Sequence, residues 1–461
     1  MTEARMKNLI IVNKIKASMQ VLGLVTLNIL SILCCSQSPV WFDQSPFGHQ
    51  EGIRNATVTS PDGDVVFPML YLQQSSPLWF QFDWITDDQE WLRYKIFHCD
   101  ANGKVNDIDY TEFVQGFETQ EISESPQFGL NTTTDYVHYH LPFPNDMMRP
   151  SISGRYWLLI YRNNDWQNQE NHVVAFPFFV VEEKVLLATQ TRRSSQGRTI
   201  QSHQQLDVTV NPNGQFFSDI YRDIHLQVFQ NFEMQPSEAC INPKPTFVEP
   251  HQWRFIDDVN PGFTGGNEWR MMSTVDISAP GFNIDHTLPN QEWPEVFVAL
   301  DQPNSRTRSS WMDYNGKNIW VTKNSSVHAV ECDYFLTHFQ FKGSHESEQS
   351  LYLEIQTTLG IKELFPCSYD ANSGLYRCDA LLKQGIYNYR YRYLGLNQPE
   401  DETSYTEGHF AMTGNDYHCF LYQRDPVYGL DRIIGFQKVS SQPRRSSLLA
   451  MERWLRIASA G

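Results

Sequence analysis

The strongest constraint on the fold of this chain is a series of short segments in which apolar and polar residues alternate. The segment WFQFDW at residues 79–84 has this pattern, and YVHYHL at residues 136–141 repeats it. Alternation with a period of two places every second side chain on one face of an extended strand. Turn-forming residues such as DANG at residues 100–103 separate these segments at intervals of roughly ten residues. The pattern therefore predicts an all-β protein built of tandem β-sandwich domains.

The strand-like segments fall into three blocks, as expected for a chain of 461 residues and domains of about 150 residues. The first block covers residues 38–183, and the second covers residues 184–323. The third covers residues 324–437 and ends with HCFLYQRD at residues 418–425. We predict one sandwich for each block. Residues 438–461 are basic and only partly amphipathic, which predicts a poorly ordered tail.

The N-terminus predicts export. Lys14 and Lys16 precede an apolar run from Val21 to Cys35, which is shorter than the about 20 residues that a membrane-spanning helix needs. A basic stretch before such a run is typical of a secretory signal peptide, which we place at residues 1–36. The tandem cysteines in the run leave a membrane-tethered lipoprotein as an alternative. No later segment is long and apolar enough to span a bilayer, so we expect no direct membrane span.

The charge of the chain argues against one class of partner. The formal net charge is −17, and a chain this acidic is repelled by phosphate backbones. We therefore expect no nucleic-acid partner. The 41% of hydrophobic residues supply enough apolar surface for folded cores.

The cysteines permit disulfide bonds in an exported chain. Of the eight cysteines, two lie in the predicted signal peptide, which leaves an even number at irregular spacing. Cys367 and Cys378 flank a hairpin-like stretch, so they can lie opposite each other on paired strands. Cys332 and Cys419 lie on the first and last strands of the third block, which are often neighbours in a sandwich. Both pairs are candidate disulfides, and buried free thiols are the competing interpretation for the other cysteines.

One glycine-rich segment, GFTGGNEWR at residues 262–270, raises the question of chemistry. A phosphate-binding loop needs a helix behind its glycines, but a strand-like segment follows here and the acid at position 268 would repel a phosphate. We interpret Gly265, Gly266, Asn267 and Glu268 as a structural turn that enters a strand of the second block, with the glycines at positive φ. On this interpretation Glu268→Gln is tolerated in function, whereas Gly265→Val destabilises the fold.

No combination of residues in the sequence predicts catalysis or a cofactor. His138 and His140 share one face of a strand, but a metal site needs a third ligand, so we interpret them as solvated histidines. His98 adjoins Cys99, but neighbours in a strand point to opposite faces, so they do not form a catalytic pair. The patterns GxSxG and HExxH do not occur. We therefore predict no enzyme activity, no metal and no cofactor.

Several segments, in order along the chain, resemble motifs of the plug protein family of the type IX secretion system. The resemblance extends from about residue 60 to residue 437 and so covers all three blocks. The long basic N-terminal region, several cysteines and the basic tail depart from the family pattern. The segments are VVFPMLYL (65–72), YKIFHCDANG (94–103), YTEFVQGFETQEISE (110–124), HYHLPFPNDMMRPSISGRYWLLIY (138–161), PTFVE (245–249), FTGGNEWR (263–270), LLKQGIYNYRY (381–391), TEGHF (406–410) and YQRDPVYGLDRIIGF (422–436).

The resemblance implies tandem immunoglobulin-like β-sandwich domains and a non-enzymatic role. A member of this family is expected in the periplasm, at the inner face of the outer membrane. There it binds the periplasmic side of the outer-membrane translocon barrel and closes the pore when no substrate passes. Within the first domain, residues 100–113 are our candidate for the contact with the barrel.

A second class of function stays open on the residues alone. Trp and Tyr are abundant, and aromatic rings stack on the apolar faces of sugars as readily as they fill a core. The third block, with LYRCDALLKQGIYNYRYRY at residues 375–393, looks like the early-set domains found beside sugar-active enzymes. The alternative is therefore a secreted carbohydrate-binding protein or an accessory module of a sugar-active system. Polysaccharide binding that is lost on replacing exposed Trp or Tyr would support it, whereas co-purification with an outer-membrane barrel would support the plug.

Overall fold

The computed structural model describes residues 51–74, 76–234, 242–289, 293–311, 313–323, 328–343, 349–357, 362–395, 402–425 and 428–442. Nearly all regular structure in these ranges is β, as the alternation predicted. The helical elements are short turns: η1 (Tyr110–Glu112), η2 (Gln169–Asn171), α2 (Ile220–Asp223) and α3 (His328–Glu331). The predicted signal peptide at residues 1–36 lies outside the described residues, and so does most of the predicted tail.

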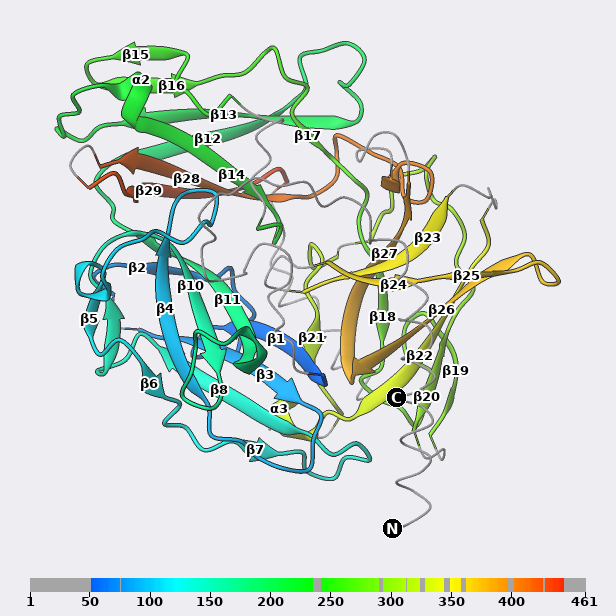
Figure 1. Cartoon of the computed structure of the whole chain (residues 1–461). Helices are drawn as coiled ribbons and strands as arrows, with labels where there is room; N and C mark the ends of the chain where they lie inside the picture. The colour runs from blue at the N-terminus through cyan, green and yellow to red at the C-terminus, as the bar shows by residue number, and fades with distance from the viewer. Residues whose placement is uncertain are drawn as a thin grey trace, which may run out of the picture. The chain divides into compact units, whose positions relative to one another are not determined.

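Two sheets formed by residues 53–181 share one core, and we call them the first sheet pair (Figure 1). Their strands are β1 (Ile53–Thr59), β2 (Met69–Tyr71), β3 (Leu78–Trp84), β4 (Arg93–Cys99), β6 (Gln120–Glu121), β7 (Gln127–Phe128), β8 (Val137–Phe143), β10 (Gly154–Tyr161) and β11 (His172–Val181). One sheet has the order β1-β3-β8-β7, and the other has the order β2-β11-β10-β4-β6. Two further strands, β5 (Val114–Gly116) and β9 (Met148–Pro150), form a separate two-stranded sheet. The pair lies wholly within the predicted first block.

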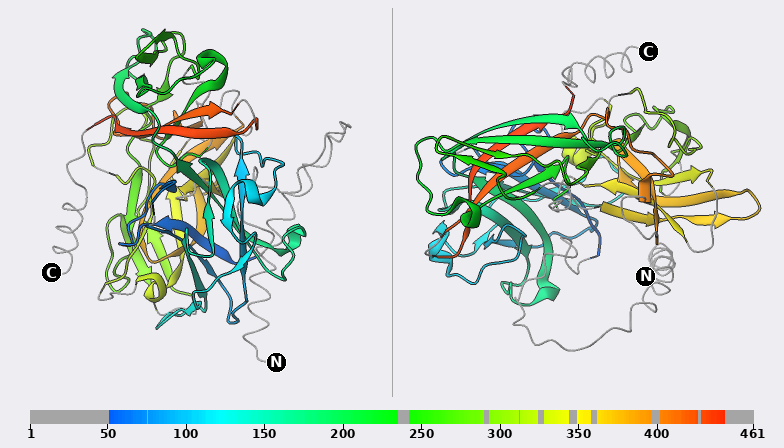
Figure 2. Two further views of the ribbon diagram at one scale, coloured as in Figure 1. Left: turned by 90° about the vertical axis from the view of Figure 1, so that its left-hand side faces the viewer. Right: turned by 90° about the horizontal axis from the view of Figure 1, so that it is seen from above.

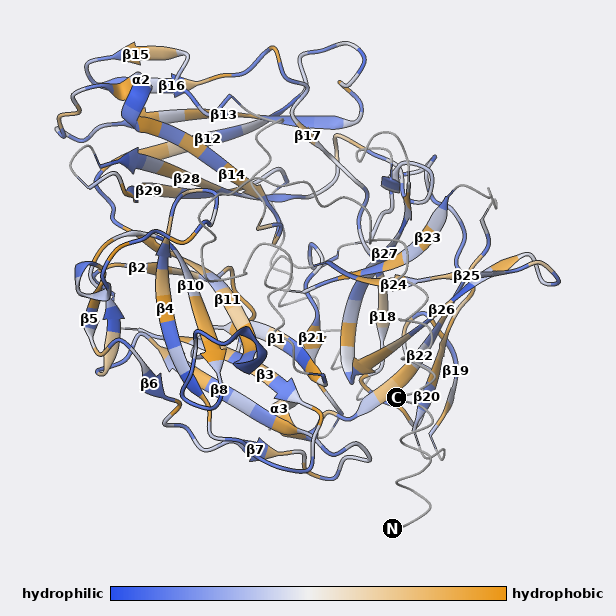
Figure 3. Cartoon of the chain, in the orientation of Figure 1, coloured by the Kyte–Doolittle hydropathy of each residue, from blue (hydrophilic) through white to orange (hydrophobic). Residues whose placement is uncertain are grey.

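The core of the first sheet pair explains why its central strands are apolar. Phe80 contacts Phe143 and Phe176 edge to face, with ring centroids 6.1 and 5.4 Å apart. Strands β10 and β11 are buried along their whole length, because one face covers this core and the other faces neighbouring elements. Much of β10 accordingly carries the apolar colour in Figure 3. Burial on both faces replaces strict alternation by a continuous apolar run.

A second sheet pair combines strands that are distant in the sequence. One sheet contains β12 (Leu186–Arg193), β13 (His203–Asn211), β16 (Gln252–Phe255) and β15 (Phe247–Glu249), and β17 (Phe263–Thr264) pairs with β13. The other sheet contains β14 (Ile224–Gln230), β28 (Asp416–Arg424) and β29 (Asp431–Ser440), in that order. The red β28 and β29 lie beside the green β14 in Figure 2. The two sheets share a core around the buried Trp253.

The third sheet pair contains the remaining strands. One sheet has the order β18 (Arg270–Ser273), β27 (Gly385–Leu394), β23 (Ser350–Gln356) and β24 (Lys362–Pro366), and β21 (Ile319–Trp320) pairs with β27. The other sheet has the order β19 (Ile284–Leu288), β20 (Glu295–Val298), β22 (Tyr334–Phe341), β26 (Leu375–Lys383) and β25 (Ser368–Asp370). Tyrosines of β27 and phenylalanines of β22 meet in its core.

The predicted boundary between the second and third blocks, at residues 323 and 324, is therefore wrong. Strands β18 to β21 lie before it in the sequence but belong to the third sheet pair. Strands β28 and β29 lie in and beyond the predicted third block but complete the second sheet pair, and β29 continues past the predicted end at residue 437. Alternation predicts that a segment is a strand, but it does not say which strand becomes its partner.

Candidate functional site

The segment at residues 262–270 carries the chain from the second sheet pair into the third. It begins in β17, which pairs with β13, and it ends in β18, which pairs with β27. The expected turn therefore enters a strand of the third sheet pair rather than of the second. The two glycines differ in their roles. Gly266 has the predicted positive φ of 64°, but the same prediction is wrong for Gly265. Gly265 is required for a different reason, because a Cβ there would lie 2.1 Å from the carbonyl oxygen of Phe410.

The two residues after the glycines bind two connecting segments, one between β20 and β21 and one between β27 and β28. The Asn267 amide nitrogen donates to the backbone carbonyls of Asn304, Thr307 and Glu407, at 3.3, 3.2 and 2.9 Å. Glu268 is buried, and its Oε1 accepts hydrogen bonds from the Arg308 guanidinium at 3.0 Å and from the Gly414 N–H at 3.1 Å. Glutamine also carries an Oε1 acceptor, so the tolerance of Glu268→Gln stays a prediction. The segment acts as a structural junction.

Replacing Gly265 should cost more stability than replacing Gly266. Gly265→Val forces side-chain atoms against the Phe410 carbonyl, so we expect a loss of about 3 kcal/mol in the free energy of unfolding. Gly266 has no heavy atom near its Cβ position, and Asn tolerates a left-handed backbone, so Gly266→Asn should cost less than about 1 kcal/mol. Urea unfolding of the two variants measures both values. Equal losses of stability in the two variants would contradict the different roles of Gly265 and Gly266.

A buried ionic cluster follows directly from this segment. Arg270 donates from Nε to both carboxylate oxygens of Glu407 at 3.1 Å and from Nη1 to Asp301 at 2.8 Å. Asp301 also accepts hydrogen bonds from the hydroxyls of Tyr389 and Tyr391, at 2.9 and 3.1 Å. Burial alone would lower the pKa of Arg270, but Glu407 and Asp301 raise it above its ordinary value. The cluster therefore holds one cation and two carboxyl groups inside the third sheet pair.

A second buried cluster joins the first and third sheet pairs. Asp83 of β3 accepts a hydrogen bond from the Lys383 ammonium and another from the Tyr334 hydroxyl, both at 2.7 Å. The Asn55 amide donates to the same carboxylate at 3.1 Å, and His138 Nδ1 lies 2.7 Å from its other oxygen. Burial favours the neutral acid, but Lys383 and His138 hold the pKa of Asp83 well below its usual value. His138 is therefore buried and bonded, and its interpretation as a solvated histidine is wrong.

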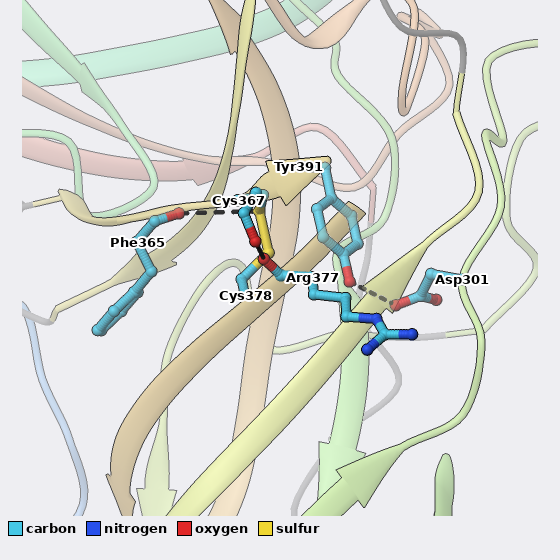
Figure 4. Close-up of a disulfide and its surroundings, with 7 residues drawn as sticks. Asp301, Phe365, Cys367, Arg377, Cys378 and Tyr391 are labelled. Atoms are coloured by element: carbon cyan, nitrogen blue, oxygen red, sulfur yellow. Dashed lines mark hydrogen bonds between the residues drawn. A yellow bond between two sulfur atoms is a disulfide. The ribbon is translucent and has the colours of Figure 1, made fainter. Parts of the chain in front are cut away.

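The structure contains one of the two candidate disulfides. Cys367 and Cys378 are bonded, and Figure 4 shows the bond beside Phe365, Arg377 and Tyr391. The Cys332–Cys419 pair is wrong, because both are free buried thiols. Cys332 precedes β22 of the third sheet pair, whereas Cys419 lies on β28 in the core of the second. Cys99 is likewise a buried free thiol, and Cys240 lies outside the described residues.

The candidate contact segment at residues 100–113 is only partly available to a partner. The Ala101 N–H donates to the Asp431 carboxylate at 3.0 Å, and the Arg155 guanidinium donates to the Ala101 carbonyl at 3.3 Å. The same guanidinium donates to the Met234 carbonyl at 3.2 Å. The turn at residues 100–103 therefore packs against the second sheet pair and is used within the chain.

Two buried histidines lie close to the joint between the first and second sheet pairs. His98 Nε2 lies 3.2 Å from the Ser153 carbonyl, and its Nδ1 lies 2.8 Å from the Asn106 amide nitrogen. A neutral ring that is protonated on Nε2 satisfies both contacts. Burial lowers the pKa of His98 to about 4. Burial also lowers the pKa of His418, which stacks on Phe67, to about 3.

These histidines should make stability fall on mild acidification. An unfolded histidine binds a proton near pH 6.5, whereas the folded protein excludes that proton down to pH values near 4 and 3. Their contribution to stability is thus complete above pH 6.5 and is lost as the pH falls towards the folded pKa values. We expect a loss of about 2–3 kcal/mol per pH unit near pH 5, measured by urea unfolding. His418→Phe should reduce this slope. A flat profile between pH 6.5 and 5 would contradict the assignment.

The ranges that the structure describes contain neither a cluster of metal ligands nor a membrane-spanning helix. No group of three or more His, Cys, Asp or Glu in these ranges could hold a metal ion. No helix within them has the length and apolar character needed to cross a membrane.

Comparison with known proteins gives a match to one family model and a likeness to solved structures. Residues 53–182, which form the first sheet pair, match the family model described as the type 9 secretion system plug protein first domain. No curated protein matches the chain. Among solved structures, the chain is similar to a hypothetical protein from Parabacteroides merdae, with a TM-score of 0.77 and 22% identity over 86% of this chain and 98% of that one. At this identity the likeness shows a shared fold.

The family match covers the part of the chain in which the sequence motifs YKIFHCDANG, YTEFVQGFETQEISE and the FPND turn occur. In the structure these motifs form β4, the strands β5 and β6, and the turn between β8 and β9. All of them belong to one folded unit with its own core. The first sheet pair is therefore similar to the first domain of the type 9 secretion system plug protein.

Proposed function

We propose that this protein is a non-enzymatic plug of the type IX secretion system. It binds the periplasmic side of the outer-membrane translocon barrel and closes the pore when no substrate passes. The observation that carries the proposal is the match of residues 53–182 to the first domain of the plug protein. The protein acts in the periplasm, at the inner face of the outer membrane.

The structure supports this role in two ways. The Cys367–Cys378 disulfide is of a kind that persists in oxidising compartments such as the periplasm. The buried Asp83–Lys383 bond fixes the first sheet pair to the third, and the Arg155 bonds to Ala101 and Met234 link the first to the second. A protein that blocks a pore benefits from such fixed joints, because a stiff body pays less conformational entropy on binding. We further assign each sheet pair an immunoglobulin-like topology.

The carbohydrate-binding alternative has less support. It rests on the abundance of Trp and Tyr, but Trp253 and 13 of the 21 tyrosines are buried. The aromatic residues of the LYRCDALLKQGIYNYRYRY segment, such as Tyr389 and Tyr391, face the core of the third sheet pair. Their number is therefore explained by packing.

Affinity purification of a tagged full-length copy from envelope fractions of the native host tests the proposal. We expect a very large outer-membrane barrel subunit to co-purify in near-stoichiometric amount. A tagged, unrelated periplasmic protein from the same cells controls for non-specific capture. If the tagged protein elutes alone, or with glycan-processing enzymes, the plug assignment is wrong.

A further inference from the structure

We propose that the outer edge of strand β12 is an interaction surface, and that its partner is the same edge of a second copy of this chain. Strand β12 (Leu186–Arg193) stands at one end of its sheet in the second sheet pair, and among the described strands only β13 pairs with it. The two copies join edge to edge, with their β12 strands antiparallel about a two-fold axis. This inference does not depend on the proposed function.

The hydrogen bonds to β13 show which backbone groups of β12 face outwards. The Ser194 N–H donates to the His203 carbonyl at 3.1 Å, so the even-numbered residues of β12 form the hydrogen-bonded pairs with β13. The N–H and C=O groups of Leu187, Thr189 and Thr191 therefore point away from β13. Within the described ranges no other backbone group bonds to them. Such a row of unpaired donors and acceptors is a template for a further strand.

The edge of β12 also lacks the features that usually block strand addition. Residues 186–191 (LLATQT) contain no charge, proline or glycine. Their register with β13 is continuous, without a bulge. Other end strands differ in this respect, because β1 has a register shift, β24 ends in Pro366, and the Leu226 N–H of β14 donates to the Pro243 carbonyl at 2.8 Å.

The backbone pattern fixes how two copies of β12 can pair. A new ladder needs the outward-facing residues of one copy opposite those of the other. In an antiparallel pair centred on Thr189, this residue lies opposite itself, and Leu187 lies opposite Thr191 of the second copy. The exposed side chains of Leu186, Ala188 and Gln190 then stay on one face of the extended sheet. Because residues 186–191 are uncharged, no like charges oppose each other there.

The charges at the two ends of β12 are complementary in this register. Arg193 lies opposite Val185 of the second copy, next to the segment that carries Glu183. Within one copy the Arg193 guanidinium donates to the Met412 sulfur at 3.0 Å. In the described part of the chain neither Arg193 nor Glu183 forms an ion pair, and both are exposed. The two-fold axis brings one Arg193 and one Glu183 together at each end, which favours a second copy over an unrelated strand.

The neighbouring charges are already used within one copy. Arg192 donates to Asp207 at 3.0 Å, and Lys184 pairs with Glu182 at 2.5 Å. One cation and one carboxylate on each copy are thus left for an intermolecular pair.

Light scattering of the purified protein over a range of concentrations tests the proposal. We expect the mass to rise from the monomer value towards twice that value as the concentration increases. Thr189→Pro removes the N–H at the two-fold axis but no bond to β13, so it should raise the dissociation constant about tenfold or more. Arg193→Glu should weaken the dimer in the same direction, and the double variant Arg193→Glu with Glu183→Arg should restore it. The control is Arg198→Glu, which makes the same charge change at an exposed residue outside β12 and should leave the mass unchanged.

A cysteine on the axis gives a second measurement, which does not depend on the strength of the dimer. Oxidation of Thr189→Cys should link two copies through this residue, because the axis places it opposite itself. Arg198→Cys should not link them. An equal yield of linked dimer at both positions would contradict the register.

Two further results would overturn the inference. One is a wild-type protein that stays monomeric at every concentration; if Thr189→Pro then loses an outer-membrane barrel that the wild type recovers, a strand of the barrel occupies the edge instead. The other is a dimer that persists in both Thr189→Pro and Arg193→Glu, because a different surface would then hold the copies together. Neither result bears on the plug assignment, which recovery of the barrel by the wild-type protein tests separately.

Discussion

Replacement of Lys383 by methionine should lower the free energy of unfolding by about 3–5 kcal/mol. The Lys383 ammonium bonds to the Asp83 carboxylate at 2.7 Å and to the Ala329 carbonyl at 2.6 Å. The side chains of Lys383 and Asp83 are 2% and 1% exposed, so water does not replace the lost cation. Methionine has a similar volume and leaves the carboxylate buried without its main counter-charge. Urea unfolding at pH 7 measures the loss.

A second substitution, at the ion-pair partner Asp83, provides the control. Asp83→Asn in the Lys383→Met background removes the orphaned charge, so it should recover part of the lost stability. Lys323→Ala breaks a comparable ion pair at the surface, between Lys323 and Asp276, and should cost less than about 1 kcal/mol. A loss below about 1 kcal/mol for Lys383→Met would mean that the remaining hydrogen bonds of Asp83, from Tyr334 and Asn55, are enough to stabilise it.

Replacement of Arg270 by methionine should destabilise the protein by a similar or larger amount, about 3–5 kcal/mol or more. Arg270 is the cation that contacts both Asp301 and Glu407, and the latter also accepts a hydrogen bond from the Tyr391 N–H at 2.9 Å. Without the guanidinium, the buried carboxylates of Asp301 and Glu407 repel each other and have no counter-charge. The same measurement, urea unfolding at pH 7, reports the loss.

A version of the Arg270 cluster without charges tests whether unpaired charge causes the loss of stability. The triple variant Arg270→Met, Asp301→Asn and Glu407→Gln keeps the shapes but removes the charges, so it should be more stable than Arg270→Met alone. Arg270→Lys should rescue little, because an ammonium cannot bond to Glu407, Asp301 and the Gln302 carbonyl in the fork geometry seen here. If the triple variant is no more stable than Arg270→Met, the loss comes from packing rather than from unpaired charge.

Much of the architecture could be predicted from alternation, because a strand with one buried face imposes a period of two on its residues. The first block could be delimited for the same reason, since its strands pair among themselves. The buried charges could not be predicted. Arg270 follows an apolar residue, and Lys383 ends an alternating strand, so each has the sequence context of a solvated charge. Their partners, Asp301 and Asp83, lie 31 and 300 residues away.

The segment at residues 262–270 shows the same limit of prediction from sequence, because its role depends on contacts with distant residues. The sequence singled out the glycine pair at residues 265 and 266, and it predicted left-handed backbone for both. Only the contact of Gly265 with Phe410, which is distant in the sequence, shows that this glycine is needed for close approach. Likewise the open edge of β12 is visible only after the other strands of its sheet have found their partners.

The return of β28 and β29 to the second sheet pair has a consequence for the order in which the chain can fold. Strand β14 pairs with β28 over seven positions, yet residues 231–415 separate the two strands in the sequence. The first sheet pair can fold as soon as its own residues are available, but the second must wait until the C-terminal strands have been made. A chain cut before residue 416 would keep every strand of the third sheet pair and still leave the second half-built, with the apolar face of β12 and β13 uncovered. A loss at the C-terminus would thus appear as exposed apolar surface in the middle of the sequence, where chaperones and proteases recognise incompletely folded chains.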